Sequence, residues 1–576
     1  MSIDYKLDVH HNYKEFLENI IINFPPTVKI LIVVDEEIGV IPGPMAFGIG
    51  RVIDLIRNTT VGIMRFNVTL AVRQNIQTIN PTPYEFKYTG FKFDQKESDG
   101  KNTIDKFDEI WCFGFKPGND AGPDSNIALP ENLPISDSEL NVLTKWMNNH
   151  GGIFATGDHD YLGASMCSRI PRVGTMRLWT NADGVPPIGG EDRIDTNRPA
   201  NAAQADTGGM PEVMPFDNQS DWVPQQIEWV VWAKRFDIRP YVTLIRPHPV
   251  LCHPKLGPIN VMPDHPHEGR CFDTKEIEIR LRGKPSIFLK EIKLDGTYNF
   301  NGYSGDEYPE VDSLRPTPNV IAYGTTLPDP PYIHFKGDSP FKRFPMISIY
   351  DGHIVDVGRV IVDSTWHHWL DLNLTEIETS TDKNNWEKIQ RYFVNVALWL
   401  APKRISRRIF TYHVLESHFT YLGFREFSIK SNLFENGYPL KRELSRYFGP
   451  CWVSDLILEW IKINDKGLYQ NILSHYFEIP ELKKPKPGPT PCLSCPPLDL
   501  LEDVILGGMV IQTIPLIKEI KEQIKINNRF DDSFELEQFE KQLIQGTSYG
   551  LNEISSVLDN STKYSQKLFK INIVAD

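Results

Sequence analysis

The segment 136–163 constrains the fold more strongly than any other part of the sequence. Ser136 and Glu139 have the spacing of a capping box, which predicts the start of a helix. The helix is expected to end at Gly151-Gly152, because glycine readily adopts the left-handed conformation of a helix C-cap. The apolar run Ile153–Thr156 then predicts a buried strand, followed by a tight turn. A helix, a stop, a buried strand and a turn in this order are typical of an α/β protein with a parallel sheet.

The same alternation of strand and helix patterns extends over most of the chain. Lys29–Val34 is a continuous apolar run, as expected for a strand buried on both faces of a parallel sheet. Pro345–Tyr350 and His353–Val362 are predicted to form a hairpin around Asp351-Gly352. The other predicted strands are Arg65–Val72, Phe107–Gly114, Val242–Ile245, Glu276–Leu281 and Asn319–Tyr323. The predicted helices are Phe47–Arg57 and Trp386–Leu400.

Three regions follow from these patterns. Residues 1–27 are a helical lead-in, residues 28–402 form the α/β domain with a polar insertion at 184–224, and residues 403–576 form a mainly helical C-terminal domain. The C-terminal domain contains a proline-rich connector at 480–497 and helix candidates at Asp503–Ile524 and Phe534–Leu558. We expect the helical domain to mediate assembly, for example as a homo-oligomer.

Composition narrows the class of protein. The net charge of -14 argues against broad affinity for nucleic acid or an anionic membrane, which leaves a small molecule as the expected partner. The N-terminus has no signal-peptide pattern, and no apolar run approaches the roughly 20 residues that span a bilayer. Seven cysteines, an odd number at low density, fit reduced thiols. A cytoplasmic protein is therefore expected.

Three features resemble the class I glutamine amidotransferase superfamily, and within it the trehalose-utilisation (ThuA-like) branch. They are the helix–strand–turn unit Trp146–Gly163, the strand Val357–Val362 followed by Asp363 to His368, and the final helix Ile389–Leu400. The resemblance covers residues 28 to 402. It implies a flavodoxin-like α/β fold, with a mostly parallel sheet, helices on both faces and long insertions.

The turn after the Gly-Gly strand departs from this resemblance. Glutaminases of the superfamily present a cysteine nucleophile there, whereas this chain has His159, and the next cysteine is Cys167. A thiolate nucleophile needs a sharp turn to expose it and a base beside it. Cys167 lies within the predicted following helix, so a cysteine-dependent glutaminase is not expected.

Polar side chains of the turn form the first candidate site. Asp158 is expected to bind substrate and His159 and Asp160 to act in catalysis, because the turn lies at the strand end where such sheets bind ligands. Alternatively, an aspartate only caps the next helix. Arg169 and Arg172 are candidates for binding a phosphate or carboxylate of the substrate, or for pairing with nearby acids.

Histidines suggest a divalent metal such as Zn²⁺. His265 and His267 project to the same side of an extended chain, and His367 follows the late strand at the same sheet edge. Glu268 is the candidate carboxylate for proton transfer beside them. The alternatives are surface histidines in a proline-rich loop and, after the late strand, a histidine satisfied in the core. Phe47–Gly50 lacks the full glycine spacing, so no nucleotide cofactor is indicated.

Two functional hypotheses result. The first is a cytoplasmic, metal-assisted hydrolase or lyase of the ThuA-like kind, acting on a polar small molecule such as a carbohydrate derivative. The second is a ligand-binding sensor or scaffold without catalysis, in which the helical C-terminal domain mediates assembly. The long C-terminal extension favours the second, and the histidines expected near one sheet edge favour the first.

Overall fold

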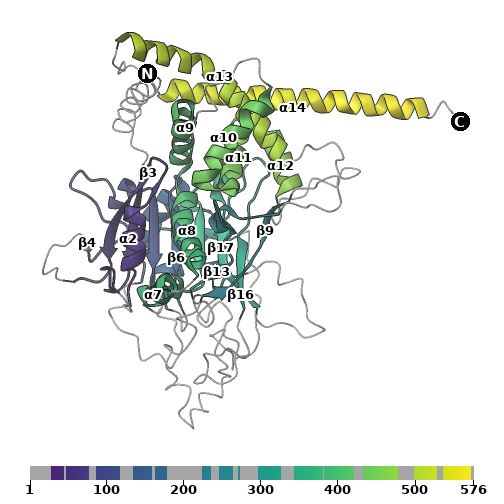
Figure 1. Cartoon of the computed structure of the whole chain (residues 1–576). Helices are drawn as coiled ribbons and strands as arrows, with labels where there is room; N and C mark the ends of the chain where they lie inside the picture. Colours follow the sequence, from purple (N-terminus) through teal and green to yellow (C-terminus); the bar gives the residue numbers. More distant parts are fainter. Residues whose placement is uncertain are drawn as a thin grey trace.

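The computed structural model describes a central sheet, the helices that cover it and a helical C-terminal region (Figure 1). The described residues are 27–43, 47–76, 86–116, 134–158, 162–177, 179, 224–234, 245–263, 270–272, 296–325, 343–379, 382–420, 432–477, 498–527 and 536–572.

A ten-stranded mixed sheet forms the core. Its strands are β1 (Thr27–Val34), β2 (Thr60–Val61), β3 (Met64–Val72), β4 (Phe86–Thr89), β5 (Glu109–Phe113), β6 (Gly152–Thr156), β8 (Glu228–Trp229), β16 (Asn319–Thr325), β17 (Arg343–Tyr350) and β18 (Val360–Asp363). Their order is β2-β3-β1-β5-β6-β18-β17-β16-β8, with β4 beside β3. The strands from β4 and β3 through β18 are parallel to one another. β2 and the strands from β17 to β8 pair antiparallel. The predicted mostly parallel sheet is confirmed.

Short two-stranded ladders lie outside this sheet. They pair β10 (Ile245–Pro247) with β9 (Val231–Lys234), β11 (Cys252–His253) with β12 (Gly257–Pro258), β13 (Val261–Met262) with β7 (Gln225–Gln226), and β14 (Thr297–Phe300) with β15 (Tyr303–Asp306).

Helices pack on the sheet, and along the chain they alternate with its strands. They are α2 (Gly50–Asn58), α3 (Asp137–Asn148), the four-residue α4 (Ala164–Cys167), α7 (Asp371–Thr379) and α8 (Lys383–Leu400). The capping box of α3 is confirmed, since the Ser136 hydroxyl accepts a hydrogen bond from the backbone N–H of Glu139 and the Glu139 carboxylate accepts one from that of Ser136. The buried side of α8 includes Tyr392, Phe393 and Trp399, which fill the core beneath β6 and β18.

The predicted glycine stop of α3 was wrong in detail. The helix ends at Asn148, and His150 rather than a glycine takes the left-handed conformation, with φ of 71°. Gly151 is needed because a Cβ there would lie 2.4 Å from the ring of Trp146. At Gly152 a Cβ would lie 2.2 Å from the carbonyl oxygen of Leu400. These two glycines therefore allow close packing of β6 against α3 and α8, which sequence alone does not distinguish from a helix C-cap.

The predicted hairpin near Asp351 is confirmed in its pairing but not in its turn. β17 and β18 are antiparallel neighbours, with Tyr350 opposite Val360. The connection is longer than a two-residue turn, because a 3-10 helix at Gly352–Val355 follows Asp351 and Asp356 adopts a left-handed φ of 61°.

The C-terminal third is helical, as predicted. Its helices are α9 (Lys403–Thr420), α10 (Leu433–Phe448), α11 (Pro450–Asn464), α12 (Lys466–Tyr476), α13 (Leu498–Asn527) and α14 (Leu536–Asn572). These helices lie at one end of the sheet and α7 at the other, and the end of α14 extends away from the rest of the protein (Figure 1). Among the described residues, Leu498–Gln523 in α13 is long and apolar enough to cross a membrane, but 67% of its apolar 18-residue window is buried inside the protein.

Buried charge clusters join the helical region to the α/β region. Arg246 of β10 contacts Glu502 of α13 at 2.9 Å, and Lys441 of α10 lies 2.8 Å from the same carboxylate. A second cluster surrounds Arg359, immediately before β18, and includes Asp455 of α11 at 2.9 Å. Because breaking a buried pair leaves an uncompensated charge, these contacts fix the helices against the sheet.

Several predicted segments lie outside the described residues. They are the lead-in before residue 27, the insertion 184–224 except its last residue, the strand Glu276–Leu281, all of Val242–Ile245 except its last residue, and the connector 480–497.

The buried Glu109 in β5 gives a prediction about stability and pH. Burial raises the pKa of its carboxyl well above the usual value, and the neighbouring Asp108 raises it further. The native state therefore binds a proton that the unfolded state releases above about pH 4.5, so stability falls as pH rises. Glu109→Gln is expected to remove this loss of stability. The loss amounts to about 1.4 kcal/mol for each pH unit between the pKa of Glu109 in the unfolded state and its pKa in the native state.

Urea denaturation of the wild type and Glu109→Gln from about pH 5 to pH 8 measures this difference. The exposed Glu387→Gln is the matched control and is expected to follow the wild type. Parallel stability curves for the wild type and Glu109→Gln would contradict the prediction.

Candidate functional site

The carboxyl ends of four parallel strands meet at one edge of the sheet. Asp35 follows β1, Phe115 follows β5, Asp158 follows β6 and Thr365 follows β18. Open α/β sheets bind their ligands at this edge, so we define the carboxyl-edge site by the side chains that gather there. The site lies toward α7, away from the C-terminal helices (Figure 1).

Asp158 and His367 form the centre of the carboxyl-edge site. The Asp158 side chain is fully buried, and its Oδ2 lies 3.4 Å from Nε2 of His367. The hydroxyl of Thr365 donates a hydrogen bond of 3.1 Å to Oδ1 of Asp158. The same hydroxyl accepts the backbone N–H of His367 at 3.0 Å, at the start of the 3-10 helix Trp366–His368. Thr365 therefore fixes both the carboxylate and the histidine.

Arg177 holds the two turns that carry this pair. Its guanidinium is fully buried and donates to the carbonyl oxygen of Asp158 at 3.0 Å and to that of Ser364 at 2.6 Å. It also lies 4.5 Å from the ring centroid of Trp179. Burial lowers the pKa of Arg177, and nearby acidic groups partly offset this decrease. Its contacts make it a positioning residue, since it binds backbone carbonyls on both sides of the site.

His368 has a different environment from its neighbour. Its Nδ1 lies 2.7 Å from Oδ1 of Asp363, and both side chains are fully buried. The other oxygen of Asp363 accepts hydrogen bonds from Trp369 at 3.1 Å and Tyr392 at 2.9 Å. The sequence left open whether the histidines after the late strand face the site or the core. The structure places His367 beside Asp158 and His368 in the core.

Aromatic rings flank His367. Trp366 stacks on the His367 ring with centroids 4.5 Å apart, and Phe47 and Phe115 pack against Trp366 at 5.2 and 5.5 Å. Phe47 is 52% exposed, although the other aromatic rings of this group are buried. The carboxyl-edge site thus combines a buried acid–histidine pair with an aromatic surface open to solvent.

Asp35 contributes a second carboxyl group at this edge. It accepts hydrogen bonds from the backbone N–H groups of Phe115 at 2.7 Å and Lys116 at 3.0 Å. Burial raises the pKa of Asp35 to about 6, against the effect of these two hydrogen bonds. Its described contacts join the ends of β1 and β5.

The structure describes four of the nine predicted site residues. It brings Asp158 and His367 together, whereas Arg169 and Arg172 contact other parts of the protein. Arg169 pairs with Asp137 at 2.5 Å, and Arg172 donates to Asn148 at 2.7 Å. The predicted residues His159, Asp160, His265, His267 and Glu268 lie outside the described residues.

Thr365 and Phe47 were missed by the sequence predictions. Thr365 stands two residues before His367, the spacing at which a threonine hydroxyl caps a helical turn, and this spacing is the signal that could have identified it. Phe47 precedes a helix and carries no such signal, because only the packing of β1, β5 and β18 brings it to Trp366.

Within the described part of the chain, no group of three or more His, Cys, Asp or Glu side chains is arranged to hold a metal ion. The predicted ligand set includes two histidines outside that part, so it stays a prediction. Scans against family models and searches of curated proteins and solved structures found no match.

Cys167 is poorly suited to nucleophilic attack. It is fully buried, and burial together with the neighbouring Cys112 raises the pKa of its thiol well above the usual value. Iodoacetamide is therefore expected to leave Cys167 unmodified in the native protein, because the thiolate is the reactive form. Mass spectrometry of native and urea-unfolded samples measures the modification. Equal rates of Cys167 labelling in both samples would contradict this expectation.

Proposed function

We propose that the chain is an enzyme that acts on a polar small molecule at the carboxyl-edge site, with His367 transferring a proton. The observation that carries the proposal is the placement of Nε2 of His367 3.4 Å from a buried oxygen of Asp158. A buried carboxylate favours the protonated form of an adjacent imidazole, which makes the histidine a better base. Thr365 and Arg177 keep the pair in place from both turns.

The strand order supports a doubly wound α/β fold, the class to which the superfamily expected from the sequence belongs. In chain order, the parallel strands β1, β3, β4, β5, β6 and β18 lie in the sheet as third, second, first, fourth, fifth, sixth, and leaving out the four-residue β4 gives second, first, third, fourth, fifth. The first is the order of the classic dinucleotide-binding fold and the second is the flavodoxin-like order, and both folds bind ligands at the carboxyl edge. We propose the flavodoxin-like fold for the α/β region and the ThuA-like branch, in the cytoplasm, as its family.

The proposed reaction is hydrolysis or elimination by a lyase. His367 would remove a proton from water or from the substrate, and His159, Asp160 and Glu268 are the proposed further acid–base groups. The exposed Phe47 beside Trp366 gives an apolar surface on which the face of a sugar ring could lie, so a carbohydrate derivative is the proposed substrate class.

In the second form of the proposal, His265, His267 and His367 hold a divalent metal, and His159, Asp160 or Glu268 rather than His367 then transfers the proton. A carboxylate beside a histidine, as Asp158 lies beside His367, is the arrangement that commonly orients metal-bound imidazoles. The ion would polarise the substrate or activate water. Elemental analysis of the purified protein tests this part. His265→Ala and His267→Ala are each expected to lose the metal.

A panel of glycosides, sugar lactones and sugar esters tests the proposed enzyme. We expect turnover of at least one compound class by the wild type, and its loss in Asp158→Asn, which preserves the side-chain shape but not the charge. The matched control is Asp137→Asn, whose exposed carboxylate pairs with Arg169 away from the site. Saturable binding of a compound without turnover would instead support the sensor or scaffold hypothesis.

A further inference from the structure

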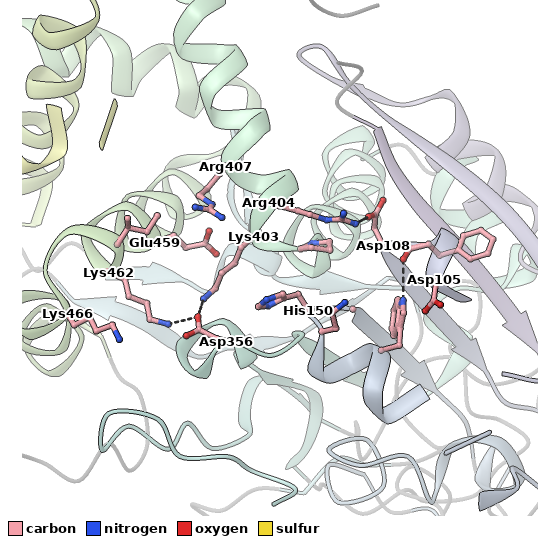
Figure 2. A pocket seen from close by; sticks show the side chains of 16 residues that line it. Asp105, Asp108, His150, Asp356, Lys403, Arg404, Arg407, Glu459, Lys462 and Lys466 are labelled. Carbon is pink, nitrogen blue, oxygen red and sulfur yellow. Dashed lines mark hydrogen bonds and ion pairs between the residues drawn. The ribbon is translucent and has the colours of Figure 1, made fainter. Parts of the chain in front are cut away.

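A cavity of about 760 Å³ lies at the amino edge of the parallel sheet, opposite the carboxyl-edge site. Its walls come from the segment before β5, the turn between α3 and β6, the start of α9 and the adjoining ends of α11 and α12 (Figure 2). Small-molecule sites typically enclose about 300–1,000 Å³ and are common where structural units meet. The cavity therefore has the size and the position of a ligand site.

Cationic side chains line the part of this cavity that the C-terminal helices form. They are Lys403, Arg404 and Arg407 of α9, Lys462 of α11 and Lys466 of α12. The chain as a whole has a net charge of -14, so this concentration of positive charge is not a property of the general surface.

Two of the lysines share one carboxylate. Nζ of Lys403 lies 2.6 Å and Nζ of Lys462 3.0 Å from the same oxygen of Asp356, on which both side chains converge in Figure 2. Their side chains are only 16% and 14% exposed. Because one carboxylate cannot neutralise two ammonium groups, an excess positive charge remains at a largely buried position.

Arg407 and His150 add groups without hydrogen-bond partners. Nε of Arg407 and Nδ1 of His150 are buried and have no such partner among the described residues. The ion pair between Arg407 and Glu540 spans 3.9 Å, which is long. Burial lowers the pKa of His150, and the nearby ammonium group of Lys403 lowers it further. A positive electrostatic potential at this wall has this second effect.

Two carboxylates of the cavity wall are held by other partners. Asp108 accepts a backbone N–H from Lys29 at 3.0 Å and pairs with Arg404 at 2.8 Å. Glu459 lies 2.7 Å from Nδ1 of His353 and belongs to the Arg359 cluster. The side-chain contacts of these two carboxylates are therefore directed at Arg404, His353 and Arg359, whereas Lys403 and Lys462 meet at Asp356.

We propose that this cavity binds a phosphate-bearing small molecule, with Lys403, Lys462 and Arg407 contacting the phosphate oxygens. A phosphate group carries up to two negative charges and several acceptor oxygens, which matches three cations that converge from two helices. Helix α9 begins at Lys403, so the N–H groups of its first turn add to the positive potential. The indole of Trp146 in the wall provides an apolar surface for the rest of the ligand. This site is separate from the carboxyl-edge site, and its occupation does not depend on the proposed catalysis.

Calorimetric titration of the full chain with ATP, glucose 6-phosphate and inorganic phosphate tests the proposal. We expect saturable binding at one site by at least one of them, and the comparison of ATP with glucose 6-phosphate separates nucleotides from sugar phosphates. Lys403→Gln and Arg407→Gln are each expected to weaken that binding by about 10-fold or more. Lys101→Gln, whose side chain is 76% exposed in another loop, is the matched control and is expected to bind as the wild type does.

A second measurement uses the unaltered protein and does not depend on the folding of any variant. Acetylation of lysines with and without the bound phosphate compound, read by mass spectrometry, is expected to show protection of Lys403 and Lys462 but not of Lys101. The proposal is overturned if no phosphate compound binds below about 1 mM. Binding that protects neither Lys403 nor Lys462 would overturn it as well.

Discussion

Replacing Arg359 with methionine is expected to lower the free energy of unfolding by about 3–5 kcal/mol. The guanidinium is 3% exposed and lies 2.8 Å from Asp351 and 2.9 Å from Asp455. A third carboxylate, that of Glu459, lies at 3.7 Å. Methionine retains much of the side-chain length, so the main effect is the loss of the cation that compensates these buried carboxylates.

The pH dependence separates this charge effect from a packing defect. Burial raises the pKa of Asp455 to about 7 even beside Arg359, so without the guanidinium this carboxyl is expected to hold its proton more strongly. The native variant would then bind protons that the unfolded chain releases, and its stability would fall as pH rises. Urea denaturation is therefore expected to show a larger deficit for Arg359→Met at about pH 8 than at about pH 5.

The control for Arg359→Met is Arg169→Met. Arg169 pairs with Asp137, and the two side chains are 49% and 48% exposed. Exposed pairs contribute about 0–1 kcal/mol, so this variant is expected to remain close to the wild type. If Arg359→Met proves as mild as Arg169→Met at both pH values, the Arg359 cluster does not hold the helical region on the sheet.

Replacing His367 with alanine is expected to reduce turnover of the substrate found in the compound panel by about 10²–10⁴-fold. The reason is the loss of the imidazole that lies 3.4 Å from Asp158 and that Thr365 positions through its backbone N–H. The circular dichroism spectrum is expected to be retained, and the melting temperature is expected to fall because the buried Asp158 loses its neighbour while keeping the hydrogen bond from Thr365. Initial-rate kinetics over a range of pH measures the effect.

His368→Ala is the matched control at the adjacent position. This variant removes the partner of Asp363 at 2.7 Å in the core, so the expected result is reduced stability, with turnover retained in the fraction that stays folded. Equal turnover by His367→Ala and the wild type would remove His367 from the proposed mechanism. A stability loss without a change in kcat would give His367 a structural role only.

Several strands and helices of the α/β region could be predicted from the sequence. The apolar run Lys29–Val34 and the capping box at Ser136 and Glu139 specify β1 and the start of α3, because periodicity and capping depend on residues close together in the chain. The roles of Gly151 and Gly152 could not be predicted, because they depend on Trp146 and on the distant Leu400.

The carboxyl-edge site was predictable only in part. Asp158 and His367 were candidates because each follows a predicted strand, and parallel strands end at the same edge. The sequence does not show which of the adjacent residues His367 and His368 faces the site. The structure decides this, because it places His368 against Asp363 in the core.

The sequence by itself determined that this protein is built on a mostly parallel sheet with a helical C-terminal region, because local patterns encode secondary structure. The tertiary structure alone decided where charges meet. Lys403 and Lys462 converge on Asp356 from 47 and 106 residues away, and Arg359 meets Asp455 from 96 residues away. Charges so far apart in the chain become neighbours only through packing, so no local pattern records either cluster.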